Sequence, residues 1–256
     1  WYMLAPMPAS RVNVFTIPAS APFLTVLIDA LREGRLVPGF PTSSDPLALA
    51  HATIYLPTRR ACRLARDVFL ERLGTDAAIL PRIVPLGDID EDEIAFAEAA
   101  TAELAEAALD IPPAIAPLER RLLLAELILK WANSPEMRGA EGSPLVANTP
   151  STALGLADDL ARLMDDMTTR QVGWDKLDTL VPDDLDTYWQ RSLRFLTIAR
   201  DTWPAIRAER GAIESAERRD LLIEAEAKRL AGSDAPVIAA GSTGSMPATA
   251  KLLATI

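Results

Sequence analysis

Residues 52–73 read ATIYLPTRRACRLARDVFLERL, and this stretch decides the fold. Its first five residues are apolar or β-prone, which predicts a short buried strand over 52–56. A two-residue turn follows, and a helix is predicted from Arg59. Thr58 stands at the position where a hydroxyl can accept a hydrogen bond from an amide of the first helical turn. Apolar residues then recur at helical spacing and provide a face to pack on a sheet: Ala61, Leu64, Ala65, Val68 and Phe69.

The start of the same helix is rich in arginine. Arg59, Arg63 and Arg66 fall roughly on one face, and Arg60 lies in the first turn. A helix start offers unpaired N–H groups and the positive end of the helix dipole. Thr58, Arg59 and Arg60 are therefore a candidate phosphate site. The alternative interpretation is a solvated basic face on an ordinary strand–helix unit.

Composition limits the class of protein. The chain has 256 residues and a formal net charge of −10, so it can bury a substantial core in one or two domains. The negative charge argues against non-specific nucleic-acid binding by the whole chain. Any contact with nucleic acid would have to use a local basic patch such as 59–66.

Metal and redox chemistry have few candidate residues. The chain contains one cysteine, Cys62, and one histidine, His51, which cannot form a structural zinc site or hold an iron–sulfur cluster. An internal disulfide is also impossible, as is usual in a reducing compartment. No apolar run reaches the roughly 20 residues that span a bilayer, and the start WYMLAPMPAS does not resemble a secretory signal. We expect a cytoplasmic protein that does not contact a membrane.

The first third of the chain alternates strands and helices. The run 12–17 predicts a first buried strand, and 23–31 predicts a helix that Gly34 closes. After the strand and helix of 52–73, short extended pieces are expected at 78–80 and 83–86. This β-α-β-α-β order is typical of a parallel sheet with covering helices.

From 88 onward the pattern is helical. Helices are predicted near 90–108, 117–132, 151–169, 184–203 and 215–231. Pro204 is expected to kink or end the fourth.

The strand pattern returns at 236–240, followed by GSTGS and a helix near Pro247. We therefore predict an α/β core over 1–87, a helical insertion over 88–233 and a return to the core over 234–256. The last helix has no C-cap, which suggests a fragment of a longer protein.

Three motifs could carry chemistry. The acidic run DIDEDE at 88–93 could bind a divalent metal, but Asp88 and Glu91 also suit a capped helix start. GSTGS at 241–245 stands where a phosphate loop would, yet it lacks the lysine and spacing of one, so a tight turn explains it better. His51 has no nucleophile placed with it by any motif, so no catalytic residue is expected.

Six stretches, taken together and in order, resemble the N-terminal part of the AddB family. They are NVFTIPASAPFLTVL (13–27), ATIYLPTRRACRLAR (52–66), ILPRIVPLGDIDEDE (79–93), PPAIAPLERRLLLAELIL (112–129), LDTYWQRSLRFL (185–196) and PVIAAGSTGSMPATAKLL (236–253). AddB, here of the alphaproteobacterial type, is the second subunit of the AddAB helicase–nuclease, which processes double-strand DNA breaks.

The resemblance implies a superfamily 1 helicase-like, P-loop NTPase-type core with a helical insertion similar to subdomain 1B. Two departures imply loss of ATP hydrolysis: IPASAPFLTVL follows the first strand without glycine or lysine, and PVIAA leads to GST without an acidic pair. The iron–sulfur cluster and Mg of the family belong to a nuclease domain absent from these residues, so no cofactor is expected here.

The resemblance also implies partners. In such helicases the turn after the second core strand touches the single-strand backbone, and Thr58, Arg59 and Arg60 match it. The expected partners are DNA and an AddA-like motor subunit, and the expected role is a DNA-channel and scaffold element without chemistry of its own. Two alternatives stay open: a nucleotide-dependent enzyme that uses GSTGS as a divergent phosphate loop, and a helical module, 88–231, that binds a protein.

Overall fold

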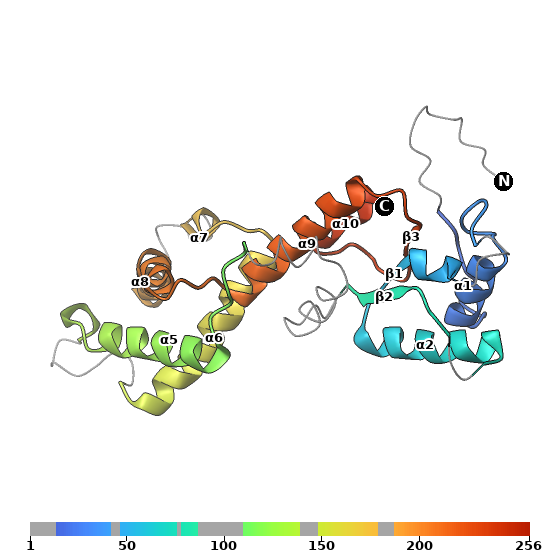
Figure 1. The fold of residues 1–256 in the computed structure, drawn as a ribbon. Coiled ribbons are helices and arrows are strands. Elements are labelled where there is room, and N and C mark those ends of the chain that lie inside the picture. The colour runs from blue at the N-terminus through green and yellow to red at the C-terminus, as the bar shows by residue number, and fades with distance from the viewer. Residues whose placement is uncertain (1–13, 42–46, 76–77, 87–109, 139–147, 179–186) are drawn as a thin grey trace. The chain divides into compact units, whose positions relative to one another are not determined.

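The computed structural model describes residues 14–41, 47–75, 78–86, 110–138, 148–178 and 187–256 (Figure 1). The chain divides into two compact units, and each is described by itself. The first comprises the described parts of Trp1–Asp90 together with Lys228–Gly244 and Leu252–Ile256. The second comprises the described parts of Glu91–Ala227 together with Ser245–Lys251.

A three-stranded parallel sheet forms the centre of the first unit. Its strands are β1 (Thr53–Leu56), β2 (Arg82–Pro85) and β3 (Val237–Ala239), in the spatial order β2-β1-β3. Every residue of β1 is buried, as expected for a central parallel strand, whereas all three residues of β3 are partly exposed. The predictions of strands at 52–56, 83–86 and 236–240, and of their parallel arrangement, are confirmed.

Two helices pack with this sheet. Both α1 (Phe23–Arg32) and α2 (Arg59–Leu73) bury apolar faces in one core with the strands. That core contains Leu27, Ile28, Leu31, Ile54, Leu56, Cys62, Ala65, Phe69, Ile83 and Ala240. A short 3-10 helix, Ala48–His51, leads into β1. Of the apolar face predicted for the helix from Arg59, Ala65 and Phe69 are buried in this core and Ala61 and Val68 pack against it, whereas Leu64 is 52% exposed.

The second unit is helical. It contains α5 (Pro117–Ala132), the 3-10 helix Pro135–Met137, α6 (Pro150–Thr169), α7 (Asp175–Asp178), α8 (Thr187–Glu209) and most of α9 (Ser215–Ala231). Helices α5 and α6 lie side by side (Figure 1). Ala125, Ala153 and Ala157 are buried where the helices meet, and such small side chains allow close approach. The final helix, α10 (Pro247–Thr255), has residues in both units.

Some expectations differ from the structure. Residues 14–17 are irregular rather than a strand, and Val14 is 82% exposed. Of the two effects expected of Pro204, a kink or an end of the helix, the end is wrong, because α8 continues to Glu209. Helix α7 was not predicted. The helix expected near 90–108 and the acidic run at 88–93 lie outside the described residues. The structure is thus a mixed α/β fold with a small parallel sheet.

Candidate nucleic-acid interface

Thr58 caps α2 at the carboxyl end of β1. Its backbone is extended, with φ −139° and ψ 156°, and its Oγ1 accepts a hydrogen bond from the Ala61 amide at 3.1 Å. This is the capping geometry that the sequence predicted. The cap pairs one of the first-turn amides and fixes the direction in which α2 leaves the sheet.

The first two positions of α2 carry the candidate arginines. Arg60 is exposed, and Arg59 is partly exposed. Their main-chain N–H groups belong to the first helical turn, where an α-helix provides no carbonyl partner. Two guanidinium groups and the positive end of a 15-residue helix thus lie within one turn. An anion such as a phosphodiester suits this arrangement.

Two further arginines of α2, Arg66 and Arg72, tie the helix to its neighbours. Arg66 donates from Nη2 to the carbonyl of Ile83 at 3.2 Å and so ties α2 to β2. Arg72 donates to both carboxylate oxygens of Asp29, at 2.8 and 2.6 Å, and so ties α2 to α1. This hydrogen-bonded pairing raises the pKa of Arg72 above its ordinary value. The basic residues of α2 therefore do not act as one uniform face.

The turn after β3 lies against the turn after β1. A Cβ added to Gly241, which has φ +73°, would stand 3.3 Å from Cγ of Pro57 and 3.7 Å from Cε1 of Phe23. Gly244 also has a positive φ, +60°, and its amide donates to Oγ of Ser242 at 3.4 Å. Both turns stand at the carboxyl ends of parallel strands, the edge at which open α/β sheets bind ligands. The sequence marked each turn separately but contained no signal that they meet.

The connection before α1 lacks the features of a phosphate loop. Residues 18–22 form a turn in which the Ala21 amide donates to the Pro18 carbonyl at 3.0 Å. Pro22 precedes α1 and provides no side-chain cap, and neither proline has an N–H group. A phosphate loop encloses a triphosphate with consecutive backbone N–H groups. The two prolines interrupt such a run at both ends of this turn.

Metal ligands do not gather in the part of the chain that the structure describes: no group of three or more His, Cys, Asp or Glu side chains could hold an ion there. His51 is exposed at the end of its 3-10 helix, and Cys62 is buried in the core. Across the described ranges, no helix has the length and apolar character needed to cross a membrane.

Charged side chains of the helical unit mostly pair with one another. Arg121 contacts Asp158 at 2.8 Å, and Arg207 contacts Glu217 at 2.7 Å. Asp158, on α6, is therefore one member of an ion pair between α5 and α6.

Asp220 shows how burial acts on one of these carboxyl groups. Burial raises its pKa above the ordinary value, although Arg219 and Gln171 donate hydrogen bonds to it and favour the charged form. Arg219 approaches it at 3.3 Å and also donates to Oγ1 of Thr169 at 2.8 Å. These contacts hold α9 against the end of α6 and do not suggest a reaction.

Comparisons with protein-family models, curated proteins and solved structures find no match to this chain. The resemblance to AddB therefore stays a prediction, which depends on the six quoted stretches and their order.

Proposed function

We propose that these residues form a non-hydrolysing, helicase-like N-terminal region of an AddB-type subunit, which helps to hold DNA during double-strand break repair. The observation that carries the proposal is the position of Thr58, Arg59 and Arg60. They stand at the start of α2, at the carboxyl edge of a parallel sheet, where a strand-to-helix turn can meet a nucleic-acid backbone.

The charge distribution supports a contact with the sugar–phosphate backbone of DNA rather than recognition of its bases. A phosphate contact needs only a cation or an amide, and carries no sequence information. Arg59 and Arg60 supply two guanidinium groups on a chain whose net charge is −10, so the attraction would be local. Affinity for a single strand should then come from the complete complex, with this site as one of several phosphate contacts.

The absence of a complete phosphate loop in the 18–22 turn supports a passive role. Pro18 and Pro22 remove two amide donors from the turn before α1, and no lysine lies within it. Hydrolysis of ATP would then be performed by an AddA-like partner subunit in the cytoplasm, and this chain would require no cofactor of its own. The alternative function, a nucleotide-dependent enzyme, then depends on the GSTGS turn as its phosphate loop.

The experiment is a double substitution, Arg59→Ala with Arg60→Ala, in the complete complex. Titration of a single-stranded oligonucleotide over a range of salt concentrations should show weaker binding. If both arginines contact phosphates, the slope of log K against log salt should become shallower by about 1.4, since each phosphate contact on single-stranded nucleic acid contributes about 0.7.

The matched control is Arg32→Ala with Arg72→Ala. It removes the same charge where the last turns of α1 and α2 meet, since Arg32 of α1 and Arg72 of α2 both pair with Asp29, and it should leave the slope unchanged. An unaltered affinity and slope in the Arg59/Arg60 variant would disprove the proposed contact. Saturable, Mg-dependent ATP binding by residues 1–256 would instead favour the nucleotide-dependent alternative.

A further inference from the structure

The turns that follow β1 and β3 leave the sheet from neighbouring points. The Ala240 amide donates a hydrogen bond to the Tyr55 carbonyl at 2.9 Å, and this bond joins the two chain segments just before both turns. Gly241 comes directly after Ala240, and Pro57 comes two residues after Tyr55. The parallel pairing of the strands therefore fixes the start of each turn.

The two turns meet at Gly241. A Cβ added there would stand 3.3 Å from Cγ and 3.6 Å from Cδ of Pro57, whereas nonbonded carbon atoms are most stable about 3.5–4.0 Å apart. The φ of Gly241, +73°, also lies in the region that residues other than glycine rarely adopt. A side chain at this position would therefore be opposed both by Pro57 and by the backbone conformation.

Pro57 has little freedom to move away from such a side chain. Its ring is closed on its own backbone nitrogen, so Cγ and Cδ cannot rotate away as the end of a flexible side chain would. The hydrogen bond of Ala240 opposes a shift of Gly241 in the other direction. A displacement of the proline ring therefore moves the backbone of Pro57 and of the next residue, Thr58.

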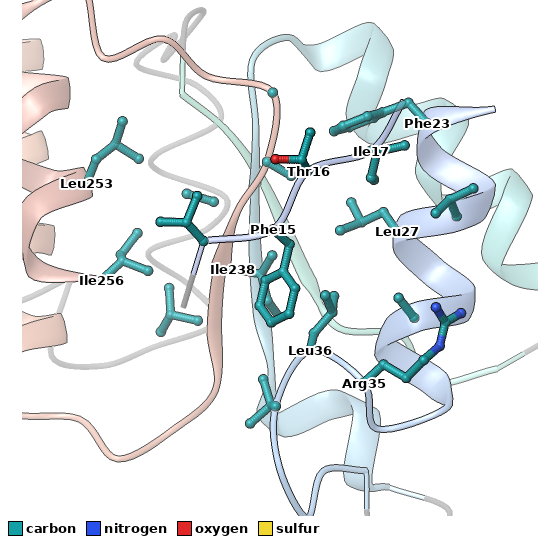
Figure 2. A pocket seen from close by; sticks show the side chains of 18 residues that line it. Phe15, Thr16, Ile17, Phe23, Leu27, Arg35, Leu36, Ile238, Leu253 and Ile256 are labelled. Carbon is teal, nitrogen blue, oxygen red and sulfur yellow. The ribbon is translucent and has the colours of Figure 1, made fainter. Parts of the chain in front are cut away.

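A substitution at Gly241 would act on this turn rather than on the buried core. Gly241 is exposed, and it lines the pocket shown in Figure 2 together with Phe23, the first residue of α1. The added Cβ would stand 3.7 Å from Cε1 of Phe23, an ordinary van der Waals distance. The contact that a side chain would strain is thus the one with Pro57.

We infer that Gly241 is a positioning residue for the candidate phosphate site at the start of α2, and that it acts through Pro57. Thr58 accepts a hydrogen bond from the Ala61 amide at 3.1 Å, so a shift of its backbone changes the cap of α2. The two arginines that follow Thr58 would then point in a different direction. The first glycine of GSTGS keeps the turns in contact, a role that requires no nucleotide. This inference rests on the proposed function, since the contact that Gly241 positions is the proposed one.

The test compares Gly241→Val with Gly74→Val in the complete complex. Gly74 caps the other end of α2 with φ +66°, and an added Cβ would meet nothing within 4 Å, so its substitution causes similar backbone strain without the contact. In titrations of a single-stranded oligonucleotide, Gly241→Val should weaken binding and make the slope of log K against log salt shallower by about 0.7–1.4, the value of one or two phosphate contacts. Gly74→Val should leave the slope unchanged. Gly241→Ala, which adds the Cβ alone, should act in the same direction and replaces the valine variant if that variant does not fold.

Removal of the proline ring provides a second-site suppressor. In a Pro57→Ala background the added side chain no longer meets Cγ and Cδ, so Gly241→Val should change the slope less than it does beside Pro57. Equal effects of Gly241→Val in the two backgrounds would overturn the inference, as would an unchanged slope in both Gly241 variants.

Hydrogen exchange of the Ala61 amide separates this inference from the proposed function. The cap by Thr58 protects that amide, so its exchange should accelerate in Gly241→Val but not in Gly74→Val. This result does not depend on whether the arginines contact DNA, which the Arg59/Arg60 variant tests by itself. An Ala61 amide that exchanges at the same rate in both valine variants would show that Gly241 does not position the cap.

Discussion

Replacing Arg120 with alanine is expected to lower the free energy of unfolding by about 3–5 kcal/mol, the usual cost of removing one member of a buried ion pair. Arg120 is only 8% exposed. Its two terminal nitrogens donate to Asp165 at 3.0 and 2.9 Å, and Nη2 also contacts the Ala161 carbonyl at 3.3 Å. Nε stands 2.8 Å from the carboxylate of Glu214. One guanidinium therefore joins α5 to α6 and to the segment before α9.

The loss of stability in Arg120→Ala arises mainly from Glu214, which stays buried after its partner is removed. Glu214 is 4% exposed and also accepts a hydrogen bond from Nε1 of Trp203. Without Arg120 its carboxylate would keep that single neutral donor in a region that water hardly reaches, and an unpaired buried charge is strongly unfavourable. The substitution Glu214→Gln should therefore recover part of the loss when combined with Arg120→Ala.

Chemical denaturation of the two variants, followed by circular dichroism, measures this effect. Arg121→Ala is the matched control, because the neighbouring side chain is 45% exposed and pairs with Asp158 at the surface. Exposed ion pairs contribute about 0–1 kcal/mol. Equal losses from Arg120→Ala and Arg121→Ala would contradict the buried network.

The elements that the sequence predicted well are those whose signal is local. β1 is continuous in apolar and β-prone residues, and α2 combines a threonine cap with a helical stripe, so both could be placed within a residue or two. The boundaries of α5 and α6 follow from proline in the first turn of each. None of these features depends on a distant part of the chain.

Features that depend on distant residues were not predictable. In the sequence, Arg120 is not distinguishable from the other charged residues of its helix. Its buried role depends on the positions of α6 and Glu214, which the sequence does not give. Likewise, the turns at Pro57 and Gly241 meet only because β1 and β3 are neighbours in the sheet. The strand predicted at residues 14–17 was wrong for a related reason. Their composition suits a strand, but a strand also needs a neighbouring strand to pair with, and the local sequence does not show whether one is present.

Phe69→Ala should destabilise the first unit by about 3–5 kcal/mol, the range measured for removal of a buried aromatic ring. Phe69 is 0% exposed and lies in the core that α1, α2 and the strands share. Truncation leaves a cavity between these elements, and hydrogen exchange of the β1 amides should accelerate accordingly. Leu64→Ala is the control on the same helix: this side chain is 52% exposed, and its loss should change stability by no more than about 0.5 kcal/mol.

The milder variant Phe69→Leu separates this core from the candidate DNA contact. Phe69 lies ten positions along α2 from Arg59, about 15 Å at the rise of an α-helix. The smaller side chain should still cost stability, yet it leaves Thr58, its cap and both arginines in place. Oligonucleotide affinity and its salt dependence should then match the unmodified protein at a temperature where the variant is folded. A loss of affinity equal to that of the Arg59/Arg60 variant would mean that binding follows the integrity of α2 as a whole, and the assignment of phosphate contact to its first turn would be wrong.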